Sequence, residues 1–246
     1  MSFSQVILSD MLFSMNPLIR LMETSKFHYL LASLALMIVL YPFIEGIGFV
    51  EYLYYIIILA IFFSSLYMLN HSPRLRRFAY FNGGLMLILV ALSGFFKDIP
   101  PAFEIVGAFA TLCFLILIAF AIIFDIFHSQ EVTADTISGA ACLYLLIGII
   151  WGEAYSMLEH LSPGSFYYSL PEKVGRMISS SFFTYFSFVT LTTIGYGDIS
   201  PVSKVAKLLV ITEAILGQLY IAIFLARIIA SYQGRKKSAP PPKDKK

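Results

Sequence analysis

Thr190-Leu191-Thr192-Thr193-Ile194-Gly195-Tyr196-Gly197-Asp198 is a polar, glycine-bearing stretch between two long apolar segments. Backbone that is not helical persists at membrane depth only where it is buried in protein or lines a water-filled path. Glycine at alternate positions permits left-handed backbone angles, so successive carbonyl groups can face one side. A row of oxygens along one axis can replace the water around a cation. The stretch therefore predicts a cation path.

The composition of the whole chain is that of an integral membrane protein. Hydrophobic residues make up 59% of the 246 residues and charged residues 13%, with a mean hydropathy of +0.81. This is more apolar surface than a soluble core can bury. The net charge of +2 is too small to indicate a nucleic-acid partner. The four histidines are scattered and no nucleophile motif accompanies them, which argues against an enzyme.

Six segments are long enough to cross a bilayer, which takes ~20 helical residues. They are residues 27–44, 49–69, 78–96, 102–127, 137–158 and 203–231. Basic residues gather before the first segment, between the second and third, and after the sixth. Because Lys and Arg are retained on the cytoplasmic side, we expect a multi-pass protein of the cell membrane with both termini in the cytoplasm.

The stretch Thr193-Ile194-Gly195-Tyr196-Gly197 differs from the potassium filter pattern TVGYG only by isoleucine for valine. Residues 137–232, less than half of the chain, resemble the pore module of prokaryotic potassium channels. The resemblance implies an all-α membrane protein with six transmembrane helices, and with a re-entrant pore helix and selectivity filter between the fifth and sixth. It also implies that K⁺ binds the backbone carbonyls of Thr193, Ile194, Gly195 and Tyr196, while Gly197 allows the required backbone angle.

This layout divides the chain into four parts. Residues 1–26 form a cytoplasmic N-terminal segment, 27–136 a four-helix module, 137–232 the pore domain and 233–246 a short basic tail, expected to be disordered against lipid headgroups. The fourth segment, 102–127, contains no Arg or Lys, so it lacks the gating charges of a voltage sensor. The acidic residues that follow it, Glu131 and Asp135, are interpreted as a solvated linker.

A short pore helix is predicted within residues 174–191, and its aromatic residues are expected to pack around the filter. Thr192, Asp198, Tyr185 and Phe186 are assigned to filter support. The related channels often carry Trp-Trp where this chain has Tyr185-Phe186, and the Tyr185 hydroxyl could reach Asp198. The acidic residues Glu159 and Glu172 are expected to attract cations to the outer mouth.

Glu213 is an acid inside the sixth segment, and we interpret it as a structural brace with altered protonation, with direct ion binding as the alternative. Its expected partners are Thr190, Thr192 or the end of the pore helix. Gly217 either forms a hinge for gating or packs against the pore helix. Three apolar residues with helical spacing are predicted to line the gate: Ile221, Leu225 and Ile228.

The sequence thus predicts a potassium-selective channel that conducts K⁺ passively and is not classically voltage-gated. One filter segment per chain implies a homotetramer, because a ring of carbonyls cannot be closed by one loop. Its other expected partners are potassium ions and membrane lipids, and no cofactor is expected apart from K⁺ in the filter. The alternatives are a subunit of a potassium transporter and a non-conducting membrane scaffold.

Overall fold

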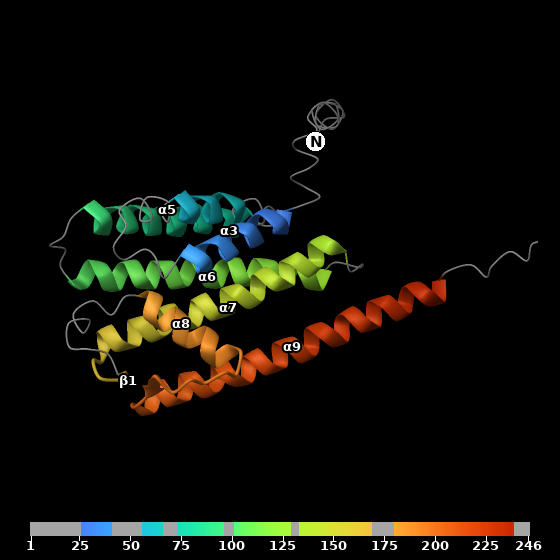
Figure 1. The fold of residues 1–246 in the computed structure, drawn as a ribbon. Helices are drawn as coiled ribbons and strands as arrows, with labels where there is room; N and C mark the ends of the chain where they lie inside the picture. The colour runs from blue at the N-terminus through green and yellow to red at the C-terminus, as the bar shows by residue number, and fades with distance from the viewer. Residues whose placement is uncertain are drawn as a thin grey trace, which may run out of the picture.

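The computed structural model describes residues 26–40, 56–65, 73–95, 101–128, 133–168 and 180–238, and it is mostly helical (Figure 1). The labelled helices are α3 (Lys26–Leu40), α5 (Pro73–Phe95), α6 (Pro101–His128), α7 (Ala134–Leu161), α8 (Ser180–Leu191) and α9 (Lys204–Ser238). A further short helix covers Ile56–Ser65. Two strands that the sequence analysis did not predict, β1 (Phe166–Tyr168) and β2 (Ile199–Pro201), form an antiparallel pair.

Three helices in the described part of the chain are long and apolar enough to cross a membrane. These spans are Ile105–His128 in α6, Ala134–Leu161 in α7 and Lys204–Arg227 in α9. Shorter apolar helices occur at Phe27–Leu40, Ile56–Ser65 and Phe182–Leu191. A membrane protein is therefore supported, while the six crossings remain a prediction.

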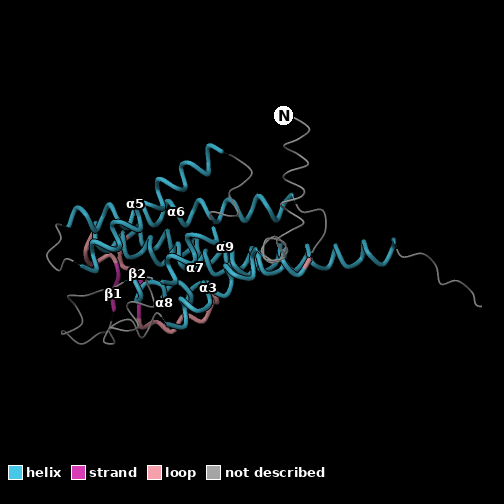
Figure 2. Tube along the Cα trace, turned by 90° about the horizontal axis from the view of Figure 1, so that it is seen from above, coloured by secondary structure: helices cyan, strands magenta, loops and turns pink. Residues whose placement is uncertain are grey.

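Helix α7 lies at the centre of the fold and contacts α3, α6, α8 and α9. A capping box begins it, because the Thr133 hydroxyl accepts from the amide of Thr136 and the Thr136 hydroxyl accepts from the amide of Thr133. Pro163 follows the C-terminal cap, Ser162. Helix α9 runs past the other helices at its C-terminal end (Figure 2).

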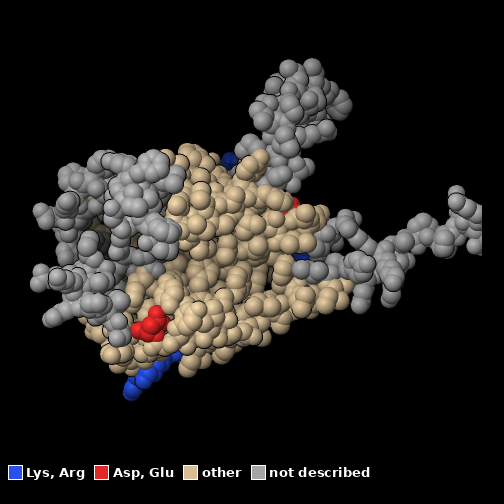
Figure 3. Space-filling view, viewed as in Figure 1, with Lys and Arg blue, Asp and Glu red and all other residues tan. Residues whose placement is uncertain are grey.

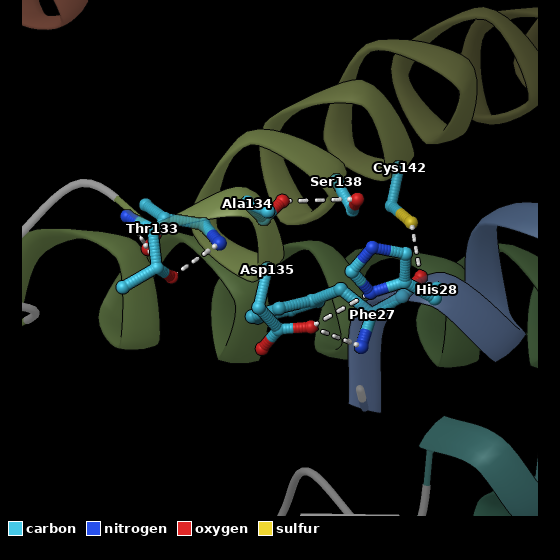
Figure 4. A network of polar contacts seen from close by, with 8 residues as sticks. Phe27, His28, Thr133, Ala134, Asp135, Ser138 and Cys142 are labelled. Atoms are coloured by element: carbon cyan, nitrogen blue, oxygen red, sulfur yellow. Dashed lines mark hydrogen bonds and ion pairs between the residues drawn. The ribbon is translucent and has the colours of Figure 1, made fainter. Parts of the chain in front are cut away.

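The start of α3 is attached to the start of α7 (Figure 4). The Asp135 carboxylate accepts from the amide of Phe27 at 3.1 Å and lies 3.3 Å from the Nδ1 of His28. The thiol of Cys142 donates to the Phe27 carbonyl at 3.4 Å. Asp135 thus satisfies an orphan amide at a helix N-terminus. The prediction of a solvated linker is wrong for this residue, whose side chain is 18% exposed, while Glu131 lies outside the described residues.

The described helices present a largely apolar outer surface, on which few Lys, Arg, Asp or Glu side chains are visible (Figure 3). The exposure is greatest on α9. Only 11% of its apolar span is buried in the single chain, against 50% of the span in α7. Helix α9 therefore has a large apolar surface available for lipid or for another protein chain.

Helix α9 ends later than predicted. It continues to Ser238 rather than ending near residue 231, so residues 233–238 of the expected disordered tail are helical. It stops just before Pro240, the first of three prolines, which cannot continue a helix. The N-terminal segment 1–25, the part of the turret at 169–179 that includes Glu172, and the tail 239–246 lie outside the described residues.

Candidate functional site

The glycine-bearing stretch begins at the C-terminal end of α8 and is joined to it by backbone hydrogen bonds. The Val189 carbonyl accepts from the amides of Ile194, at 2.9 Å, and Gly195, at 3.3 Å. The amide of Thr193 donates to Thr190 at 2.9 Å. These contacts use the carbonyls that a helix C-terminus leaves unpaired. The path of the stretch is thus fixed by a short helix whose C-terminal end carries partial negative charge.

Positive φ angles alternate along this stretch. They are 60° at Thr193, 59° at Gly195 and 80° at Gly197. Glycine adopts such angles readily, whereas a β-branched threonine rarely does. Within the described residues, no hydrogen bond ends on a carbonyl oxygen of residues 193–196. The segment therefore uses its amides on α8 and leaves a series of carbonyl oxygens available, as binding of a dehydrated cation requires.

Asp198 holds the outer end of this segment. The Tyr185 hydroxyl donates to Asp198 Oδ2 at 2.9 Å, and Asp198 Oδ1 accepts from the amide of Ile199 at 3.1 Å. The contact expected between Tyr185 and Asp198 is therefore present. A tyrosine hydroxyl keeps its hydrogen at neutral pH, so Tyr185 is the donor and the Asp198 carboxylate the acceptor in this contact.

Replacement of Tyr185 by phenylalanine is expected to shorten the time for which the conducting state lasts at low external K⁺. The change removes the donor to Asp198, a loss of about 0.5–1.5 kcal/mol per chain. In the channel that the sequence predicts, bound K⁺ would itself stabilise the segment, so the difference should shrink at high K⁺. Current decay after a step to low K⁺ measures it.

Tyr167→Phe is the matched control, because the Tyr167 hydroxyl is exposed on β1 and forms no hydrogen bond with the described residues. It should decay like the unmodified protein. Equal decay rates for Tyr185→Phe and Tyr167→Phe would show that the Tyr185–Asp198 contact does not support the segment.

Glu159 is a buried residue that organises the outer mouth rather than an exposed charge. Its Oε1 accepts from the amide of Gly164 at 2.7 Å and its Oε2 from the amide of Phe166 at 3.1 Å. Phe166 begins β1, which pairs with β2 directly after Asp198. The prediction that Glu159 gathers cations at the surface is wrong, because both of its oxygens are engaged by backbone amides and the side chain is buried.

Phe186 packs in an aromatic cluster behind α8. Its ring lies 5.3 Å from that of Tyr155 and 5.7 Å from that of Phe166, measured between ring centres. Phe183 belongs to the same cluster, 5.0 Å from Phe166. The expected aromatic packing around the pore helix is present, and Phe166, which the sequence analysis did not single out, lies at its centre.

Glu213 of α9 is fully buried and joins three helices. Its Oε2 accepts from the Tyr155 hydroxyl of α7 at 2.5 Å, and its Oε1 is hydrogen-bonded to Ser187 of α8. Of the expected partners, the end of the pore helix is present through Ser187, whereas the Thr192 hydroxyl donates to the carbonyl of Phe188 instead. Ser187 lies one helical turn before the end of α8 and faces α9 from there.

Glycines permit the closest approaches to α8. A Cβ at Gly217 would lie 2.9 Å from the backbone oxygen of Leu191, and one at Gly152 would lie 2.7 Å from the Cα of Thr184. A Cβ added at Gly148 would likewise clash with the ring of Phe188. Of the two roles considered for Gly217, packing against the pore helix is therefore present, and the hinge remains a prediction.

The predicted gate residues Ile221 and Leu225 are exposed on α9 in the single chain, while the side chain of Ile228 lies outside the described residues. The same half of α9 is attached to its neighbours. The Tyr220 hydroxyl donates to the Ala140 carbonyl of α7 at 2.5 Å. Arg227 donates to the Ile126 carbonyl in the last turn of α6. The one arginine in the apolar span Lys204–Arg227 needs such a partner, a signal that the sequence analysis missed.

Comparison with known proteins agrees with this geometry. Residues 155–233, from the end of α7 through α8 and the glycine-bearing stretch to α9, match the family described as "Ion channel". This segment is similar to ion channel domains. The rice protein named "Two pore potassium channel a" (Oryza sativa subsp. japonica) is 28% identical to this chain over 86 residues. Over these residues the chain is thus similar to ion channels.

The match to the rice protein covers only part of each chain. The aligned part is 35% of this chain and 21% of the rice protein. No solved structure matches the chain. The prokaryotic assignment and the six-helix layout therefore remain predictions, whereas the similarity to ion channels rests on the match of residues 155–233.

Proposed function

We propose that the protein is a potassium-selective channel in which four copies of the chain surround one pore. The observation that carries the proposal is the segment from Thr193 to Gly197, with alternating positive φ angles and unengaged carbonyl oxygens. Four such segments around an axis would enclose a dehydrated K⁺ in cages of oxygen. Thr193, Ile194, Gly195 and Tyr196 would supply the oxygens.

Exposure of apolar side chains in the single chain supports assembly. In the single chain the side chain of Ile194 is 54% exposed and that of Tyr196 is 68% exposed. In the proposed filter both side chains would point away from the pore axis. Neighbouring copies would cover them. The open face of α9 supports the same arrangement, since four α9 helices would line the cavity below the filter and place Ile221 and Leu225 at its cytoplasmic end.

Purified protein in liposomes tests the proposal. Single-channel currents that reverse at the K⁺ equilibrium potential, with Na⁺ as the opposing cation, are the expected result. A transporter subunit would carry K⁺ without unitary currents, and a scaffold would carry none. Native mass spectrometry of the same preparation should give four chains, and a stable dimer that conducts would overturn the homotetramer.

Voltage is expected to have little effect on open probability. Helix α6 contains no Lys or Arg, so no positive charge lies along it to move through the membrane field. Each such charge would contribute ~2.3 kcal/mol per 100 mV. Conductance measured from strongly negative to strongly positive potentials in symmetrical K⁺ should change shallowly. A steep conductance–voltage curve without blockers would contradict this prediction and place a sensor elsewhere in the chain.

A further inference from the structure

The hydrogen bonds around Glu213 carry an inference about its protonation. The Tyr155 hydroxyl contacts Oε2 of Glu213 at 2.5 Å, and Ser187 contacts Oε1. The same Ser187 hydroxyl lies 2.6 Å from the carbonyl oxygen of Gly148. Three polar contacts thus connect α7, α8 and α9 at one buried point.

Each of these contacts needs a hydrogen atom. A backbone carbonyl only accepts, while a tyrosine and a serine hydroxyl each hold one hydrogen. Tyr155 and Ser187 therefore supply two hydrogens for three contacts. The third can come only from the carboxyl group of Glu213, in which case Tyr155 donates to Glu213, Glu213 donates to Ser187, and Ser187 donates to Gly148.

The ionised form leaves this arrangement unsatisfied. If Ser187 donated to a Glu213 carboxylate, its oxygen would face the Gly148 carbonyl oxygen at 2.6 Å with no hydrogen between them. The negative charge would also be fully buried, and within the described residues no Lys, Arg or His pairs with Glu213. A buried charge without a partner is strongly unfavourable.

We propose that Glu213 is a neutral carboxylic acid in the folded protein and a positioning residue for the pore helix. As an acid it donates through one oxygen and accepts through the other, which fixes Ser187 of α8 relative to both α7 and α9. Its effect on conduction rests on the proposed channel function, whereas its protonation does not. Glutamine offers the same pattern, because its amide group donates and its carbonyl accepts.

Infrared difference spectroscopy at neutral pH tests the protonation directly. The carbonyl stretching band of a protonated carboxyl group is expected in the unmodified protein and absent from Glu213→Gln. Glu159→Gln is the matched control, since Glu159 is also buried but both of its oxygens accept from backbone amides. That variant should keep the band. Absence of the band from the unmodified protein, or its loss in Glu159→Gln alone, would overturn the proposal.

Potassium flux tests the positioning role. Glu213→Ala leaves Tyr155 and Ser187 without their partner and is expected to lower flux per tetramer about tenfold, because an unpaired buried donor typically weakens the native arrangement by that factor. Glu213→Gln should restore most of the flux. Failure of glutamine to restore it, with the infrared band present, would refute the positioning role alone. If the unmodified protein carries no K⁺ current, the proposed function fails while the infrared result still decides the protonation.

Discussion

Replacement of Gly195 by alanine is expected to abolish potassium conduction. Gly195 has a φ of 59°, where a Cβ is unfavourable by ~1–2 kcal/mol, although no atom blocks the space around it. Four copies of the strain amount to roughly 4–8 kcal/mol in a tetramer. A difference of about 5.5 kcal/mol is enough to move a two-state equilibrium from 1:99 to 99:1. The filter should therefore leave the geometry in which its carbonyls face the axis. Flux of K⁺ into liposomes measures the loss.

Gly164→Ala is the matched control for this backbone effect. Gly164 has a φ of 83° in the turn before β1, also with open space around the position of a Cβ. It carries the same kind of strain outside the ion path, so the variant should lose some stability and keep its conduction. Wild-type flux in Gly195→Ala, or equal loss in both variants, would show that the alternating φ angles are not what conduction requires.

The backbone angles of the glycine-bearing stretch could be predicted from the sequence because their requirements are local. Alternate glycines permit the left-handed angles at Gly195 and Gly197. The short helix predicted within residues 174–191 is present as α8. Thr193 is different. Its positive φ depends on hydrogen bonds between the following residues and Val189, which no property of threonine itself predicts.

The supports of the site depend on contacts between distant segments, and the sequence analysis placed them less well. Glu213 was recognised as a brace because an acid inside an apolar helix needs partners, but its partners come from α7 and α8 through the tertiary fold. Nothing in the sequence around Glu159 indicates that its carboxylate accepts from the amide of Phe166, seven residues later. The strand pair was missed because three-residue strands are too short to show an alternating pattern.

One support did have a sequence signal. Gly148 and Gly152 are four residues apart on α7, the small-xxx-small spacing that allows helices in membranes to approach closely. The structure places both against α8. The pattern could have predicted that the fifth segment packs against another helix at backbone distance, although it does not identify that helix.

Replacement of Gly152 by alanine is accordingly expected to destabilise the proposed tetramer. The added Cβ would lie 2.7 Å from the Cα of Thr184 and 2.9 Å from its amide nitrogen, and these backbone atoms can move only if α8 shifts. Overpacking of this kind costs about 1–3 kcal/mol per site. Alanine recovers up to ~1 kcal/mol of helix propensity relative to glycine, so the net loss should remain clear when summed over four chains.

Gly84→Ala separates the packing effect from helix propensity. Gly84 lies within α5, and no atom comes within 4 Å of the position of its Cβ, so alanine there should leave the thermal midpoint of the tetramer unchanged or raise it. Gly152→Ala should lower the midpoint under the same conditions. Its K⁺ flux should fall as well, because a displaced α8 carries the Val189 carbonyl and the amides of the filter with it. Equal midpoints for the two variants would mean that α7 and α8 do not depend on contact at Gly152, and the attachment of the pore helix would then rest on Glu213 and its hydroxyl partners.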